Sequence, residues 1–167
     1  REIFAEIIKK LLPRIERNEV VLMINVGDHL KVWEGLLNDI PQLKDKVQTY
    51  FNDWERTQVF ANHALEQDVN GIHIFYNEDI FAAVYSSNLL MRSADILVTK
   101  PSELAFYPVP KLMIKRVGGH EAWGAIRAAE IGDGTLECDS VGLTLQMLDL
   151  MLDDKVILKQ MCDNILK

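Results

Sequence analysis

Apolar residues recur along the chain with two different periods, one typical of helices and one typical of buried strands. Residues 3–15 place isoleucine and leucine at helical spacing with lysine and arginine between them, which predicts an amphipathic helix. Residues 20–26 form a continuous aliphatic run that ends at Gly27, a pattern typical of a parallel strand buried on both faces. The chain is therefore expected to open with a helix and then a strand.

The same alternation of strands and helices continues to the C-terminus. Further strands are predicted at residues 47–51, 71–76, 95–99 and 111–115, with a weak one at 135–138. Helices are predicted at residues 30–40, 54–67, 78–93, 121–130, 140–153 and 154–166. Because no two-residue turn joins one strand to the next, the crossover helices imply parallel pairing. We therefore expect an α/β protein with a doubly wound parallel sheet, a Rossmann-like three-layer αβα arrangement in a single domain.

Composition narrows the class of protein further. The chain has 18 Lys and Arg against 25 Asp and Glu, and this balance without a basic stripe argues against a nucleic-acid partner. Cys138 and Cys162 have no close cysteine partner, which excludes a disulfide scaffold and fits a reducing compartment. No apolar run is long enough for a transmembrane segment. The helical pattern starts at Arg1 without a methionine, so we expect the chain to be part of a longer, cytoplasmic protein.

Two loops after the first and third predicted strands are candidates for ligand binding, because ligands of open α/β sheets bind at the carboxyl ends of the strands. Gly27 comes before Asp28 and His29 and could bring backbone N–H groups close to a phosphate, but a plain helix cap at Asp28 is the favoured interpretation. Tyr76 and Asn77 could frame a nucleobase. For this pair, too, the residue types favour a structural role, with Asn77 capping the following helix.

Two later loops have a stronger pattern. Ser102 and Glu103 follow Pro101 at a predicted helix start, where the Glu103 carboxylate could accept both hydroxyls of a ribose or merely answer the helix dipole. Both interpretations stay open. The paired Gly118 and Gly119 precede His120 and Glu121, an arrangement that fits either an anion-binding turn or an ordinary strand-to-helix loop. No set of His, Cys, Asp and Glu has the spacing of metal ligands, and no serine has the partners of a nucleophile.

The stretch DILVTKPSELAFYPVPKLMIKRVGGHE, residues 95–121, is more specific than the rest. It resembles the C-terminal, donor-binding domain of GT-B glycosyltransferases, in the group that includes the peptidoglycan UDP-N-acetylglucosamine transferase and the diacylglycerol glycosyltransferases. Residues 94–101 are similar to the family's segment ending in Thr-Lys-Pro, Ser102-Glu103 to its Ser-Glu, and residues 119–121 to its Gly-Gln-Glu. The earlier segments VVLMINVGD and FYNEDIFAAVYSSNLLMRSAD are also similar, so the resemblance spans nearly the whole chain.

This resemblance implies that residues 1–167 are a nucleotide-sugar-binding domain with a UDP-sugar as donor substrate and with no cofactor or metal. Glu103, beside Ser102, would bind the ribose, and Tyr76 with Asn77 would lie beside the uracil. The positions expected near the diphosphate or the sugar are Gly27, Gly118, Gly119, His120 and Glu121.

In GT-B enzymes the acceptor site and the general base lie in a separate N-terminal domain. The resemblance therefore implies that this chain holds no catalytic residue and is inactive alone, with an N-terminal acceptor-binding domain or a separate subunit as partner. That missing domain would place a cytoplasmic protein at the inner face of a membrane if the acceptor is a lipid.

The chain departs from the family pattern at three places. The loop after the first strand has one glycine, Gly27, where the family often has several. The family's Gly-Gly-x-Thr segment is missing between Pro101 and Ser102, and Gly124 stands where the family has asparagine. Two alternatives therefore stay open: a degenerate GT-B-like interaction module without catalysis, or a nucleotide-sugar epimerase domain, which shares the architecture.

Overall fold

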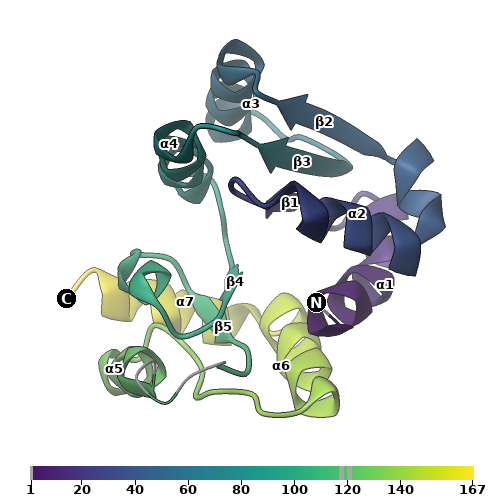
Figure 1. Cartoon of the computed structure of the whole chain (residues 1–167). Helices are drawn as coiled ribbons and strands as arrows, with labels where there is room; N and C mark the ends of the chain where they lie inside the picture. The colour runs from purple at the N-terminus through teal and green to yellow at the C-terminus, as the bar shows by residue number, and fades with distance from the viewer. Residues whose placement is uncertain (1, 117–118, 120–121) are drawn as a thin grey trace. The chain divides into compact units, whose positions relative to one another are not determined.

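The computed structural model describes residues 2–116, 119 and 122–167, and of Glu103 the backbone alone (Figure 1). The chain divides into two compact units, Arg1–Ser93 and Ala94–Lys167. Each unit is built from parallel strands and helices, so the prediction of a mixed α/β protein is confirmed. Across the described ranges, no helix is both long and apolar enough to cross a membrane.

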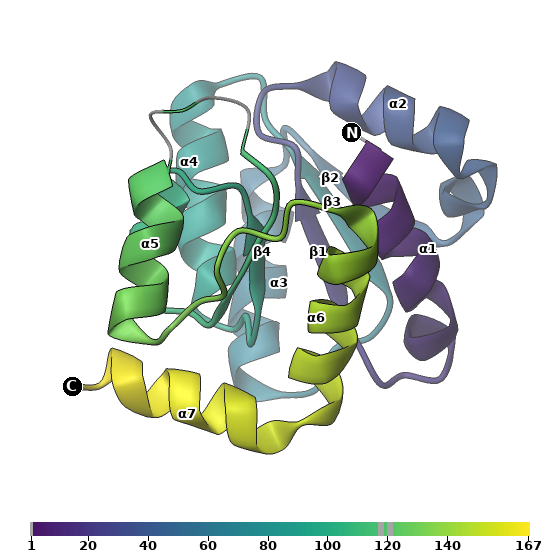
Figure 2. The same ribbon diagram turned by 90° about the horizontal axis from the view of Figure 1, so that it is seen from below.

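The first unit contains a three-stranded parallel sheet with helices on both faces (Figures 1 and 2). Its elements are α1 (Glu2–Glu16), β1 (Leu22–Asn25), α2 (Leu30–Asp39), the 3₁₀ helix η1 (Pro41–Asp45), β2 (Val47–Phe51), α3 (Trp54–Glu66), β3 (Ile72–Tyr76) and α4 (Ile80–Met91). The strand order is β1-β3-β2. The chain steps outward from β1 to β2 and back to β3, and right-handed crossovers then require α2 and α3 to cover opposite faces.

The central position of β3 decides which strand is most buried. Residues Ile72 to Phe75 of β3 are all buried, whereas all four residues of β1 are only partly buried. The prediction that the strand ending before Gly27 is buried on both faces was therefore wrong. The partial burial of β1 follows from its pairing, because β1 is hydrogen-bonded to β3 alone and forms an edge of this three-stranded sheet.

Aromatic side chains fill the space between β2, β3 and α3. Tyr50 stacks on Phe75 with ring centroids 4.6 Å apart, and Phe60 lies 5.5 Å from each of them. The His73 ring joins this group at 4.2 Å from Phe60. Trp33 on α2 is also buried. Tyr50, Phe60, Phe75 and Leu90 therefore form a buried core cluster beside the central strand of the first unit.

His73 gives this core a predictable pH dependence. Its Nε2–H donates to the Asn70 carbonyl at 2.7 Å, which leaves Nδ1 to accept from the Tyr50 hydroxyl at 3.0 Å. Burial lowers the pKa of His73 below its ordinary value. Below about pH 6.5 the unfolded chain therefore binds a proton that the folded chain rejects, and the free energy of unfolding falls as the pH falls.

We expect His73→Gln to remove part of this pH dependence, because glutamine carries no titrating group. Urea unfolding at about pH 7.5 and about pH 5.5 checks this, the loss of stability between the two being smaller in the variant than in the parent. His63→Gln, at an exposed position on α3, is the matched control and should leave the difference unchanged. Equal losses in the parent and in His73→Gln would contradict the assignment.

The second unit has a smaller parallel sheet that is followed by three helices. Its elements are β4 (Leu97–Thr99), the 3₁₀ helix η2 (Glu103–Phe106), β5 (Lys111–Met113), α5 (Ala122–Ile131), α6 (Val141–Asp153) and α7 (Lys155–Ile165). β4 and β5 pair in parallel, and residues 134–138 follow β5 through two isolated bridges, Lys111 to Gly134 and Ile114 to Cys138. The weak strand expected at 135–138 thus forms a partial third strand.

Close packing holds that partial strand in place. A Cβ atom at Gly134 would lie 2.8 Å from the Cβ of Ala128 and 3.2 Å from that of Lys111, so the position admits no side chain without a shift. Thr135 Oγ1 accepts from the Met113 N–H at 3.0 Å. Not every large side chain of the second unit is packed in this way, because Trp123 on α5 is 75% exposed.

The doubly wound arrangement that the sequence predicts is not confirmed. Within the described residues, the hydrogen-bonded strands form two sheets, of three and two strands. A dinucleotide-binding half also places its second strand between the first and the third, whereas β3 takes the middle position here. Parallel pairing, which the crossover helices predicted, is confirmed in both sheets.

Candidate functional site

Three asparagines mark the carboxyl ends of the three strands in the first unit. Asn25 is the last residue of β1, and Asn52 and Asn77 directly follow β2 and β3. Parallel strands bring these ends to one edge of the sheet, the edge at which ligands of open α/β proteins bind. Sequence analysis selected only Asn77, although an asparagine repeated after every strand was a signal that could have found all three.

Asn25 fixes the turn that carries Gly27. Its side-chain Oδ1 accepts from the Gly27 N–H at 2.9 Å, while its Nδ2 donates to Ser87 Oγ at 2.8 Å on α4. Gly27 has a φ of +60°, which glycine adopts without strain, and no atom lies within 4 Å of the place its Cβ would take. The Gly27 N–H is thus committed inside the protein, whereas the outer side of the turn faces open space.

The neighbouring Asp28 and His29 lie on the surface of that turn. His29 is the residue before α2, and no side chain caps this helix start, so the expectation that Asp28 caps α2 was wrong. The Asp28 carboxylate instead lies 3.4 Å from His29 Nε2, and both side chains are exposed. This places a carboxylate beside an imidazole at the rim of the strand-end edge.

Asn77 has an internal role. It is 3% exposed, its N–H donates to the Gly27 carbonyl at 3.0 Å, and its Nδ2 donates to Ser86 Oγ at 3.1 Å. The cap of α4 is Asp79, which accepts from the Phe81 N–H, so the expectation that Asn77 caps this helix was wrong. The buried Asn77 therefore links the end of β3 to the turn at Gly27 and to α4.

Asn52 completes the edge on the other side of β3. It has a φ of +52°, and its Oδ1 accepts from the Glu78 N–H at 2.7 Å. Tyr76 is partly buried and meets the Phe51 ring edge-on at 5.6 Å. The exposed or partly exposed residues of this edge thus include Asn52, Tyr76, Glu78 and the Asp28-His29 pair, whereas the Asn77 amide is buried.

The strand-end loop of β4 contains the residues that carry the family resemblance. Thr99 is buried, and Ser102 Oγ accepts from the Leu104 N–H at 3.3 Å. Glu103 begins the 3₁₀ helix η2 and not an α-helix, and its side chain lies outside the described part of the structure. Among the other predicted positions, Gly119 is exposed with open space around it, while Gly118, His120 and Glu121 lie outside the described residues.

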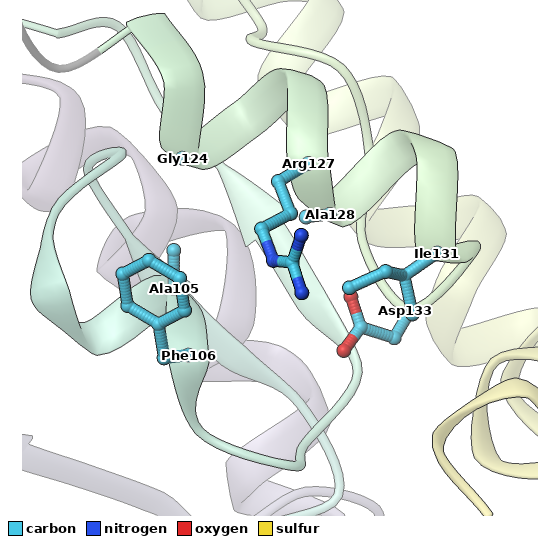
Figure 3. Close-up of a pocket in the computed structure, with 7 residues that line it drawn as sticks. All are labelled: Ala105, Phe106, Gly124, Arg127, Ala128, Ile131 and Asp133. Carbon is cyan, nitrogen blue, oxygen red and sulfur yellow. The ribbon is translucent and has the colours of Figure 1, made fainter. Parts of the chain in front are cut away.

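The second unit also holds a hollow of about 140 Å³ that the sequence did not indicate (Figure 3). Its lining residues are Ala105, Phe106, Gly124, Arg127, Ala128, Ile131 and Asp133. Figure 3 shows the Arg127 guanidinium and the Asp133 carboxylate pointing into the same hollow.

Beneath this hollow lies a buried ion pair. The Lys111 side chain is completely buried, and its Nζ lies 2.7 Å from Asp133 Oδ2. The other carboxylate oxygen, Oδ1, is buried without a hydrogen-bond partner in the part of the chain that the structure describes. A lysine at the start of an apolar strand and an aspartate in the Gly-Asp-Gly turn were the signals available in the sequence.

Other reactive groups are few within the described ranges. Cys138 is buried, and burial raises the pKa of its thiol, so the nucleophilic thiolate is disfavoured. Among the residues described, no group of three or more His, Cys, Asp and Glu could hold a metal ion. The chemistry available at the strand-end edge is therefore hydrogen bonding by backbone and side-chain groups, together with the exposed Asp28 and His29.

Together these features define an α/β protein with a candidate ligand site in each unit, at the loops that follow the carboxyl ends of its own parallel strands. The family model that matches is described as a domain of unknown function (DUF6938); it covers residues 1–167, and the chain belongs to this family. No curated protein and no solved structure matches the chain.

Proposed function

We propose that the chain is the nucleotide-sugar-binding domain of a GT-B-type glycosyltransferase that transfers a hexosyl group from a UDP-sugar. The observation that carries this proposal is the position of the segment resembling the family's Thr-Lys-Pro and Ser-Glu motifs. Thr99 ends β4, Ser102 binds the first turn of η2, and Glu103 begins that turn. The backbone of Glu103 therefore follows the carboxyl end of a parallel strand, the position of ligand-binding loops in open α/β sheets.

The turn after β1 supports the same proposal. Gly27 adopts positive φ and faces open space, so a ligand could approach its backbone closely. The doubly wound, Rossmann-like arrangement is part of the proposal, with the parallel pairing in both units as its support. The strand order of the first unit is where the chain departs from that arrangement.

This proposal assigns different roles to this chain and to a further domain or subunit. The chain would bind the donor, and a further N-terminal domain or a separate subunit would supply the acceptor site and the general base. The proposed location is the cytoplasm, at the inner face of a membrane where the acceptor is a lipid. Glu103 would accept the ribose hydroxyls, because a carboxylate forms stronger hydrogen bonds than a neutral acceptor.

Titration with UDP tests the proposal directly. UDP at a hundredfold excess over its Kd should raise the Tm by roughly 5–10 °C, because a ligand that binds only the folded chain stabilises it by mass action. Glu103→Ala should weaken UDP binding roughly 10- to 100-fold, as expected for a lost charge-assisted hydrogen bond. Calorimetry and thermal unfolding provide the two measurements.

Glu130→Ala, at an exposed position on α5, is the matched control and should bind UDP as the parent does. ADP in place of UDP tests whether the base is recognised. The proposal fails if millimolar UDP changes neither the Tm nor the NMR signals of residues around Glu103.

A binding module without catalysis is the second candidate function. The observation that favours it concerns two groups that were expected to contact the UDP-sugar. The Gly27 N–H and the Asn77 side chain instead form hydrogen bonds inside the protein, to Asn25 and Ser86. The UDP titration separates the two candidates, because only a donor-binding domain is stabilised by the nucleotide.

A further inference from the structure

The outward face of α4 is apolar and uncharged. Ile80, Phe81, Val84 and Tyr85 form what we call the α4 patch, and each is between 53% and 72% exposed. The opposite face of the helix, with Ala83, Ser86 and Leu90, is buried in the first unit. All twelve residues of α4 are uncharged. An exposed helix of this composition is typical of a surface that a partner covers.

Charges of opposite sign lie at the two ends of this helix. Glu78 and Asp79 directly precede α4, and Arg92 directly follows it, all three with exposed side chains. The acidic end and the basic end are separated by roughly 20 Å of helix. If a second α4 lies antiparallel on the first, with the two-fold axis close to Tyr85, each acidic end meets the basic end of the other copy. The helix dipoles then oppose each other as well, which adds to the attraction.

We propose that the α4 patch is a self-association surface, on which a second copy of this chain docks with its α4 antiparallel to the first. The patch is self-complementary, as a two-fold interface requires. A lipid surface fits less well, because amphipathic helices that bind membranes present lysine and arginine beside the apolar face and the chain has a net charge of −7.

The size of the patch sets the expected strength of the dimer. Trp54 on α3 extends the patch, since its ring lies 6.3 Å from that of Tyr85. One helix face and a neighbouring ring still cover less than the roughly 800 Å² per partner of a standard interface. The dimer is therefore expected to form in the micromolar range, with dissociation that is rapid on the timescale of a chromatographic separation.

Sedimentation velocity across roughly 1–500 µM protein tests the proposal, with a monomer–dimer equilibrium as the expected result. Phe81→Glu combined with Tyr85→Glu should weaken the dimer at least about 100-fold, because both aromatic anchors are replaced by charges that repel their own copies. Val32→Glu is the matched control, since Val32 is an exposed apolar residue on α2, which covers the other face of the sheet, and it should leave the equilibrium unchanged.

A charge exchange tests the antiparallel orientation. Arg92→Glu and Glu78→Arg should each weaken the dimer, since each places like charges at both ends of the paired helices. The two substitutions together should restore it, because opposite charges again meet. Far-UV circular dichroism establishes that each variant keeps its helices, and Phe81→Ser with Tyr85→Ser repeats the test without added charge.

Three results of the association experiments would overturn the proposal, and a fourth comes from a lipid-binding assay. The first is a monomer at every concentration, and the second is a dimer that the substitutions at Phe81 and Tyr85 leave intact. The third is a dimer that the charge exchange fails to restore. Binding of the monomer to phosphatidylcholine vesicles, lost on substitution of Phe81 and Tyr85, would also overturn it by assigning the α4 patch to a lipid surface.

Discussion

Replacing Asp133 with alanine is expected to lower the free energy of unfolding of the second unit by about 3–5 kcal/mol. The Lys111 ammonium is completely buried, and the Asp133 carboxylate lies 2.7 Å from it. Removing the carboxylate leaves a positive charge in the interior with its counter-ion gone, and such a charge is far more costly than the pair itself was favourable. Chemical denaturation followed by far-UV circular dichroism measures the loss.

Two further variants separate the cost of leaving the buried Lys111 charge unpaired from the loss of its contact with Asp133. Lys111→Met combined with Asp133→Leu removes both charges and should recover most of the stability, because apolar replacements of a buried pair are often neutral or better. Asp163→Ala breaks the Lys159–Asp163 pair, which has the same 2.7 Å separation but is solvent-exposed, and should change little. Similar losses in Asp133→Ala and Asp163→Ala would contradict the argument from burial.

Replacing Phe75 with alanine is expected to cost the first unit about 3–5 kcal/mol. Phe75 lies on the central strand, is completely buried, and stacks on Tyr50 at 4.6 Å. The truncation removes apolar area and leaves a cavity among Tyr50, Phe60 and Leu90, which the paired strands on either side prevent from closing. The loss is measured from urea unfolding of the variant and its parent.

Phe75→Leu is the conservative comparison, because it keeps much of the buried volume and should cost clearly less than alanine. Phe51→Ala is the exposed comparison, since Phe51 follows Tyr50 on β2 and points to the outer side of the sheet edge, where it is 36% exposed. A Phe75→Ala variant as stable as Phe51→Ala would show that the aromatic cluster is not the core of the first unit.

The strands and helices were predictable where the apolar period was long. The strand at Val47–Phe51 agrees with its predicted bounds, and the last two helices begin one residue after the predicted start, because Ser140 and Asp154 are their caps. The division into two sheets was not predictable, because periodicity identifies strands without saying which strands pair. The 3₁₀ helix at Pro41–Asp45 was not predictable either, because Pro41 indicated only the end of the preceding helix.

The candidate site was predictable as a set of loops but not as a set of contacts. The rule that ligands bind at the carboxyl ends of parallel strands selected the loops of Gly27 and Asn77, and the structure places both loops at such strand ends, but the sequence does not show where an amide points. Asn77 points inward to Ser86 because α4 presents a hydroxyl at that depth. Lys111 and Asp133 are 22 residues apart, and only folding brings the two together.

The unequal burial of the tryptophans allows the two units to be observed separately by spectroscopy. Trp33 in the first unit is buried, whereas Trp123, the only tryptophan after residue 93, is already 75% exposed. Because indole emission shifts to longer wavelength when water reaches the ring, the fluorescence change on unfolding reports mainly on the first unit. Far-UV circular dichroism reports the helices of both. A destabilised second unit would therefore unfold with little change in emission, and the two signals would show whether the units lose structure together or in turn.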